Sequence, residues 1–446
     1  MKADPGLPGS RRLAFWLLCQ LNRHPSFWRT FGAVIRRWPG LGGLLHFAAR
    51  NSAVTQALRR TDSFLNTTHR PNLVAGNFLI GMNPDAQYKA DRELFLEMMP
   101  TRACVRESSA AEARTRIEAV QAGGSAQFDL VRDYLMWIVL RAALPAFGDA
   151  AGTIAGDRFT QAADDAEKFQ YMLELRHVGA QLFAGGAAPA AVQMRAEAAA
   201  ASLKRRIRRA GDLLNRQPAA AKALAAHARS QNTSPAAGQE MVQRDGVGYA
   251  WVSHPVTVQA GALIVFELLR RRAEYDNLRA KAELLGSAVW TDAAFRELVE
   301  LHVLELMRFR PVFPVLGRDV PRDTTFDAGS GHCPAVKGGG SLTMITISAM
   351  FDPRVVSASD AYDATRPWPD RDERTLMFGY GERRCPGRDR AIDILVSAMI
   401  GVLSLPCIRQ PRWPSPRRMK YDGPMVESMP LEFGGGKGWV WPWSTA

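Results

Sequence analysis

The stretch from Phe378 to Gly387 reads FGYGERRCPG, and the apolar run AIDILVSAMIGVL follows from Ala391 to Leu403. The run is apolar on nearly every face, which predicts a buried helix. Pro386 lies at the expected start of that helix, where the amide that proline lacks is not needed. Cys385 therefore lies at a helix N-terminus with arginines on both sides, and both features favour a thiolate over a thiol.

The glycines of this stretch also suggest a function. Gly379 and Gly381 permit a left-handed backbone and the close approach of something large and flat. Gly387 removes a side chain immediately after the sulfur. A lone Cys-Pro-Gly would favour a buried structural cysteine in a turn. Here phenylalanine, glycine, arginine and cysteine hold fixed positions within ten residues, and that combination indicates a binding site.

The stretch resembles the haem-binding sequence of the cytochrome P-450 family, F-x-x-G-x-R-x-C-x-G, with Phe378, Gly381, Arg383, Cys385 and Gly387 at its fixed positions. The resemblance implies that Cys385 is the proximal thiolate ligand of the iron of haem b. Arg383 is then expected to contact a haem propionate and Phe378 to pack beside the sulfur. A thiolate ligand pushes electron density onto iron and favours O–O cleavage.

Two features of the sequence before the cysteine extend this resemblance. Glu305 and Arg308 stand at i, i+3 on one helix, as in the family's buried Glu-x-x-Arg, and are expected to be structural; alone, such a pair is most often on the surface. Arg318 falls where the family often has an arginine that binds a propionate, although an exposed arginine at a strand end fits the sequence equally well.

A third feature is the segment NFLIGMNPDAQYKADRELF, which resembles the helix that in this family leads in over the haem. Tyr88 and Arg92, at i, i+4, match its propionate-contacting pair, with Tyr88 in place of the more usual histidine. The resemblance covers the chain from about residue 75 onward.

The segment SHPVT, from Ser253 to Thr257, falls where the family's long central helix crosses the distal face of the haem. A proline inside a helix costs about 3 kcal/mol. Local sequence therefore allows a second interpretation, in which a helix begins here with Ser253 as N-cap and Pro255 in the first turn. A histidine on an apolar segment, such as His254, is also more often a core residue than a catalytic one.

In the family this helix usually carries an acid followed by a threonine, which relay protons to dioxygen. No Asp or Glu occurs between Asp245 and Glu267, and we expect Thr257 to take the role of the alcohol, displaced by a single turn. His254 and Pro255 instead resemble the arginine–proline pair of the family's peroxide-using branch, which makes His254 a second catalytic candidate.

The rest of the chain predicts a mainly α (α+β) protein, in the family's terms a helical bundle around a buried haem with small β-sheets. We expect a single domain over residues 1–446, with 1–25 as a lead-in that could be flexible. Helix formers dominate from about 85 to 310, SLTMITISAM alternates like a strand, and hairpins are expected after residue 408. No nucleotide-binding loop occurs.

Composition limits the class of protein. Hydrophobic residues form 47% of the 446, enough for a large core, and the formal net charge is +13. The five cysteines include no CxxC, which favours a reducing cytoplasm over a disulfide scaffold. The apolar part of SRRLAFWLLCQL is too short to span a bilayer, so we expect an amphipathic helix and no transmembrane segment. The cluster KRRIRR, from Lys204 to Arg209, could meet lipid or an acidic partner but is more typical of a solvated helix face.

Three hypotheses about function follow. The first is a haem-thiolate monooxygenase that inserts one oxygen atom into a small lipophilic substrate, with electrons from an acidic ferredoxin or flavodoxin. The second is a peroxide-dependent peroxygenase or a hydroperoxide-rearranging haem enzyme. The third is a basic, non-enzymatic binding protein on the same fold. No nucleic-acid-binding motif accompanies the charge, so no nucleic acid partner is expected.

Overall fold

The structure is a computed structural model. It describes residues 16–17, 19–65, 78–83, 86–123, 125–150, 198, 201–202, 205, 235–329, 331–411, 419–422 and 425–434. The α-helices are α2 (Pro25–Arg37), α3 (Pro39–Leu45), α4 (Asn51–Arg59), α6 (Ala86–Met98), α7 (Arg102–Ala122), α8 (Met136–Ala143), α14 (Pro235–Leu269), α15 (Arg272–Leu285), α16 (Ala293–Phe309), α17 (Thr346–Met350) and α18 (Arg388–Ser404). Among the shorter helices, η1 (Leu130–Leu135) is a π-helix, and the 3-10 helices are η2 (Leu144–Ala150), η3 (Gly286–Trp290), η4 (Glu373–Phe378) and η5 (Gly381–Arg383).

The strands are short and form small sheets. They are β1 (Phe47–Ala48), β2 (Gln127–Asp129), β3 (Leu316–Asp319), β4 (Thr324–Thr325), β5 (Ala335–Val336), β6 (Ser341–Met344), β7 (Lys420–Asp422), β8 (Met425–Ser428) and β9 (Pro430–Glu432). The sheet β1-β6-β3 pairs β6 parallel to β1 and antiparallel to β3. The pairs β2–β9, β4–β5 and β7–β8 are antiparallel. The predicted class, mainly α with minor β-sheets, is confirmed.

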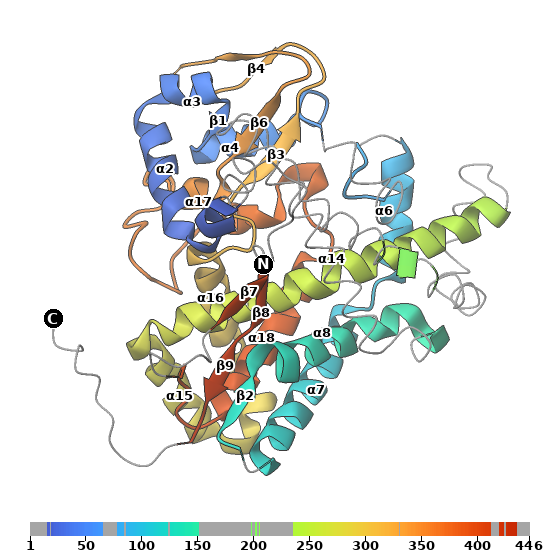
Figure 1. Ribbon diagram of the computed structural model, residues 1–446, viewed down its shortest axis with the longest axis vertical. Coiled ribbons are helices and arrows are strands. Elements are labelled where there is room, and N and C mark those ends of the chain that lie inside the picture. The colour runs from blue at the N-terminus through green and yellow to red at the C-terminus, as the bar shows by residue number, and fades with distance from the viewer. Residues whose placement is uncertain are drawn as a thin grey trace.

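The three-stranded sheet and the longer helices occupy different parts of the molecule, whereas β2, β7, β8 and β9 lie beside α18 and α8 (Figure 1). In Figure 1, the sheet β1-β6-β3 lies with α2, α3 and α4 at one end, while α14 runs across the molecule to the helices at the other. There α18 packs against α7, α16, α14 and α15. The cysteine stretch joins the two parts, since η5 contacts α4 and continues into α18.

The predicted buried helix after the cysteine is α18, whose residues from Ile392 to Leu403 are all buried. It begins at Arg388, two residues after Pro386, with Gly387 as its N-cap. Gly401 allows a close approach near its end, because a Cβ there would lie 2.1 Å from the hydroxyl oxygen of Tyr134. That hydroxyl donates a hydrogen bond of 2.8 Å to the carbonyl of Ala398.

Helix α14 runs through Pro255 without ending. The alternative, in which the helix begins at Ser253, is therefore wrong. The hydroxyl of Ser253 caps nothing and instead donates 2.6 Å back to the carbonyl of Tyr249. By length and composition, α14 from Met241 to Leu269 could also cross a membrane, but 72% of its most apolar window is buried inside the protein, as in the core helix of a soluble protein.

The segment predicted as a strand after residue 340 is only partly a strand, and two basic segments lie wholly or mostly outside the described residues. SLTMITISAM is a strand only as far as Met344, and α17 follows, because the hydroxyl of Thr346 and the amide of Ile347 bond to the chain at Phe313 and Pro314. The predicted terminal hairpin is β7–β8. Of KRRIRR only Arg205 is described, and the arginines of SRRLAFWLLCQL lie outside the described residues.

Candidate functional site

The cysteine stretch forms a folded loop between η4 and α18. Gly379 and Gly381 have φ angles of +77° and +71°, the left-handed backbone expected from the sequence. The amide of Cys385 donates 2.8 Å to the carbonyl of Phe378, which closes the loop. A Cβ on Gly387 would lie 3.9 Å from the sulfur. The backbone therefore fixes the position of the cysteine.

Two aspartates hold this loop, and the sequence did not point to either. The hydroxyl of Tyr380 donates 2.6 Å to Asp370, and Arg59 of α4 donates 2.8 Å to the same hydroxyl. Arg384 forms an ion pair of 2.5 Å with Asp372. The loop is thus tied to α4 and to the segment before η4 at two points, one between its glycines at Tyr380 and one after them at Arg384.

The surroundings of the sulfur differ from the sequence expectation in one respect. Burial raises the pKa of the Cys385 thiol, although the amides of Gly387 and Arg388 and the charges of Arg388 and Arg384 act to lower it. The helix terminus and the arginines thus act in the direction expected from the sequence, and burial outweighs them. A bound metal ion deprotonates a coordinating thiol outright.

Cys385 lies on the wall of a cavity of about 280 Å³. Its walls come from α6, α14, α18, the cysteine loop and the segment after α16. Most lining side chains are apolar or aromatic, among them Phe95, Val256 and Leu395. This composition is typical of sites for small lipophilic molecules.

One end of the cavity is cationic. Arg383 lies over the ring of Tyr88, 5.4 Å from its centroid, and both line the cavity. The guanidinium of Arg383 also donates 3.3 Å to the carbonyl of Leu79. Arg92 does not line the cavity and instead hydrogen-bonds to Tyr88. The structure thus brings Tyr88 and Arg383 together at the cavity and leaves Arg92 as a supporting residue.

Arg318 adds a buried cation to the same cavity. It lies on β3, is 9% exposed and lines the cavity, so it is not an exposed arginine at a strand end. Burial lowers its pKa to about 10. Its guanidinium donates 2.7 Å to the carbonyl of Gly317, and no carboxylate of the described residues forms an ion pair with it. A buried cation of this kind is suited to an anionic group in the cavity.

Helix α14 turns one stripe of side chains toward the cavity. Tyr249, Ser253, Val256 and Thr257 line it at helical spacing, so Thr257 faces the same space as Cys385. Tyr249 was not singled out from the sequence, and burial raises its pKa to about 12. No Asp or Glu of the described residues lines this cavity.

His254 faces the other way, so the expectation that it meets the cavity is corrected. It is 1% exposed, does not line the cavity, and its Nε2 lies 3.0 Å from the carbonyl of Met136 on α8. Burial lowers its pKa to about 4. Thr257, three residues later on the same helix, lines the cavity instead, so the two side chains meet different neighbours.

Glu305 and Arg308 are completely buried, which excludes the surface-pair interpretation. The guanidinium of Arg308 contacts both carboxylate oxygens, at 3.0 and 2.8 Å, and donates 2.9 Å to the carbonyl of Ser359. Arg366 and Arg374 lie 3.8 and 3.7 Å from the same carboxylate. The pair therefore joins α16 to the segment that leads to η4 and the cysteine loop.

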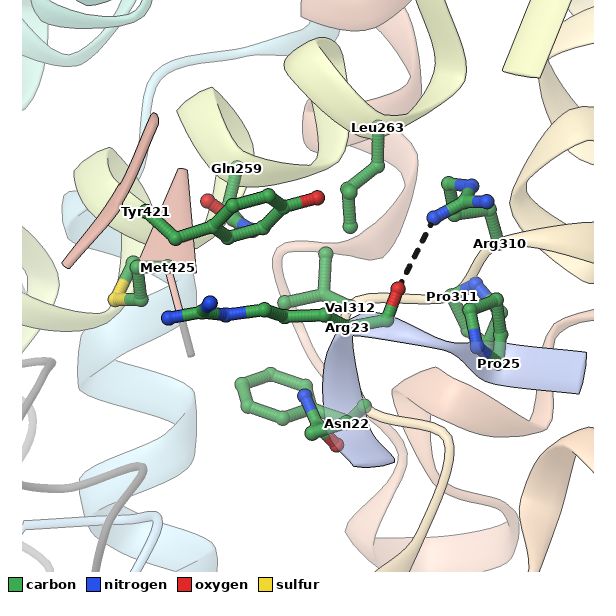
Figure 2. A pocket seen from close by; sticks show the side chains of 11 residues that line it. Asn22, Arg23, Pro25, Gln259, Leu263, Arg310, Pro311, Val312, Tyr421 and Met425 are labelled. Atoms are coloured by element: carbon green, nitrogen blue, oxygen red, sulfur yellow. Dashed lines mark hydrogen bonds between the residues drawn. The ribbon is translucent and has the colours of Figure 1, made fainter. Parts of the chain in front are cut away.

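A second, small cavity lies beside the first, and Val312 and Phe313 contact both. Figure 2 shows the ring of Tyr421 above the side chain of Arg23, with the guanidinium carbon 4.6 Å from the ring centroid. Arg310 donates 3.3 Å to the carbonyl of Arg23. The open volume of about 20 Å³ is room for about one water molecule.

No protein-family model matches this sequence. No curated protein sequence matches it either. Solved structures do. The chain is similar to CalO2 with 18% identity and a TM-score of 0.63, over 87% of this chain and 90% of that one. It is similar to P450BioI, solved with acyl carrier protein carrying hexadec-9Z-enoic acid, with 15% identity and a TM-score of 0.66, over 94% and 100%.

The chain is also similar to CYP109E1 from Bacillus megaterium in complex with testosterone, with 15% identity and a TM-score of 0.64, over 86% and 91% of the two chains. These are cytochrome P450 structures. The chain therefore has the cytochrome P450 fold.

Proposed function

We propose that this chain, with the fold of a cytochrome P450, is a haem-thiolate oxidoreductase of the monooxygenase type. It inserts one oxygen atom into a small lipophilic substrate, and the whole chain acts as a single catalytic domain. The observation that carries the proposal is the position of Cys385, on the wall of a largely apolar cavity that the hydroxyl of Thr257 also lines. All five cysteines are free, which agrees with a reducing cytoplasm.

The residues around the cavity fit haem b. Cys385 offers a sulfur ligand from a loop shaped by Gly381 and Gly387, and Phe378 lines the cavity beside it. Arg318, Arg383 and the hydroxyl of Tyr88 are suited to the two carboxylates of the porphyrin, because buried arginines need an anion. When bound, the haem supplies the redox centre at which an oxygen atom is activated.

Proton delivery would depend on Thr257. Its hydroxyl lines the cavity and has no hydrogen-bond partner among the described residues, so it can hold a proton or a water near the reacting atoms. His254 is too buried against α8 to share this task, so the catalytic role proposed for it from its sequence is now carried by Thr257 alone.

Electrons would come from an acidic ferredoxin or flavodoxin. The formal net charge of the chain is +13, and exposed cations lie beside the cysteine loop: Lys89 and Arg371 are 66% and 65% exposed, each next to a carboxylate, that of Glu382 and that of Glu300. Complementary charge brings an acidic protein to such a face and speeds its association.

A peroxide-dependent reaction is the second candidate, and one observation favours it. The cavity lacks a carboxylic acid among the described residues that line it, so protons for dioxygen reduction have few sources there. Hydrogen peroxide or a lipid hydroperoxide is already reduced and needs no such relay. Purified protein should be given either peroxide or a reductase system with a lipophilic substrate; turnover only with the reductase system would exclude the peroxide reaction.

The proposed function is tested by the carbon monoxide spectrum of the reduced protein from haem-replete cells. We expect a pigmented protein with the Soret shift typical of thiolate ligation, and Cys385→Ser should abolish that shift. Cys407→Ser, at an exposed cysteine, is the matched control and should leave the spectrum unchanged. A colourless preparation would instead support the basic, non-enzymatic binding protein.

A further inference from the structure

The face of α18 that meets the large cavity begins at the cysteine. Gly387, Arg390, Ala391, Ile394 and Leu395 all line the cavity, and their spacing of three and four residues is that of one helical stripe. Arg390 is the single charged member of this stripe. It lies one turn after Gly387, about 4.5 Å further along the helix axis.

The guanidinium of Arg390 differs from its neighbours in how its charge is balanced. Arg384 is paired with Asp372 at 2.5 Å, and Arg388 with Asp389 at 2.8 Å. Arg390 donates from Nε to the carbonyl of Pro100 at 2.6 Å, and no carboxylate in the described part of the chain pairs with it. Its charge therefore stays unneutralised at the cavity wall.

The cationic end of the cavity does not account for Arg390. Tyr88 and Arg383 meet near the start of α6, whereas Arg390 reaches Pro100, just after that helix ends. Tyr88 and the last residue of the helix, Met98, are ten residues apart, which is roughly 15 Å along the helix axis, and Pro100 follows beyond that end. The two carboxylates of a porphyrin lie along one edge, so they cannot occupy both ends.

The charge of Arg390 also acts across the cavity. Tyr249 lies on α14, which forms the opposite wall, and the positive charge of Arg390 lowers the pKa of its hydroxyl against the larger effect of burial. A group held between α14 and α18 would thus lie within the field of this arginine.

We propose that Arg390 tunes the reduction potential of the haem site. The inference rests on the proposed function, since it assumes that Cys385 holds haem. Reduction of iron(III) to iron(II) takes up one electron from a donor protein or an electrode and lowers the positive charge of the site by one. A fixed cation on the wall favours the less positive state and so raises the midpoint potential.

The test is spectroelectrochemical titration of haem-loaded protein. Arg390→Met and Arg390→Gln should shift the midpoint potential to more negative values, and Arg390→Lys should stay close to the wild type. Glutamine keeps an N–H that can reach Pro100, which separates the loss of charge from the loss of the structural bond. Arg114→Met removes an arginine of α7 that is 59% exposed and should leave the potential unchanged. Equal potentials in the wild type and both neutral variants, at full haem content, would overturn the inference.

A haem-independent measurement separates this inference from the proposed function. The haem-free protein is titrated with anilinonaphthalene sulfonate, an anionic probe of apolar cavities, and with the neutral phenylnaphthylamine. Arg390→Met and Arg390→Gln should weaken binding of the anionic probe several-fold and leave the neutral probe unaffected. If charge discrimination is lost in this way but the protein takes up no haem, the proposed function fails. If the wild type and the two neutral variants bind the anionic probe equally tightly, the inference fails.

Discussion

Two carboxylates hold the loop that carries Cys385: Asp370 accepts a hydrogen bond from Tyr380, and Asp372 pairs with Arg384. Cys385, Phe378 and the glycines could be found in the sequence because their spacing is fixed within ten residues. Asp370 and Asp372 could not, because a carboxylate in a loop carries no periodic signal that tells which arginine or tyrosine it will meet in space. Arg390 gave no signal for a related reason: an arginine near the start of a helix is usually solvated.

The role of the Thr257 hydroxyl can be tested by measuring how much product forms for each reducing equivalent that is consumed. Thr257→Val removes the hydroxyl while keeping the shape, so product formed per reducing equivalent should fall at least about tenfold, in line with the usual contribution of proton transfer. Oxygen consumption and product are measured together. Thr257→Ser keeps the hydroxyl and is the control; an equal loss in both variants would argue against a role for the hydroxyl.

His254 should make stability depend on pH. Its pKa is lowered from 6.5 to about 4 in the folded protein, so protons bind more tightly to the unfolded chain. Stability is therefore lost as pH falls below about 6.5, by about 2 kcal/mol between pH 7 and pH 5 for this group. Urea unfolding at both pH values measures it. His254→Asn should show a smaller loss, and an unchanged loss would contradict this account.

At the scale of elements, long buried helices were predictable and short changes of direction were not. The helix after Cys385 was predictable from the thirteen nearly all-apolar residues that it contains. It begins at Arg388 rather than at Pro386, because Gly387 is its N-cap. SLTMITISAM reads as one strand, yet Thr346 turns the chain into α17 through bonds to a segment about thirty residues earlier. Such tertiary bonds override local propensity. Pro255 likewise stays within α14, because the surrounding packing holds the helix together on both sides.

The contact between α18 and η1 gives a test of packing. Gly401→Ala places a Cβ 2.1 Å from the buried hydroxyl of Tyr134, which is held by its bond to Ala398. Neither partner can move freely, so the free energy of unfolding should fall by about 1–3 kcal/mol. Gly40→Ala in α3 is the control: a Cβ there meets nothing within 4 Å, and stability should stay equal or rise slightly. Similar losses in both variants would mean that the clash is not the cause.

At the scale of the whole molecule, the net charge of +13 bears on association and not on the fold. Composition predicted a large core and a basic surface, and the mainly helical class followed from the pattern of the chain. Composition gave no information on which arginines or lysines would line the cavity. Arg318 was expected there from its place in the sequence, whereas Arg390 became apparent only once α18 and α6 were seen together.

The basic surface predicts a salt dependence. Turnover supported by an acidic ferredoxin should slow at least about tenfold between about 0.1 M and about 1 M NaCl, since the Debye length falls from about 10 Å to about 3 Å. Initial rates at limiting ferredoxin measure this. Turnover supported by peroxide needs no protein partner and should hardly change. A salt-independent ferredoxin rate would mean that the basic face does not guide the donor.

The bonds that tie the cysteine loop have one more consequence. Tyr380 is bonded to Asp370 and Arg59, and Arg384 to Asp372, so contacts within the protein set the shape of the cysteine loop. These bonds do not involve the metal, so we expect the chain to accept porphyrins that carry manganese or cobalt, which provide spectroscopic signals that the iron porphyrin does not.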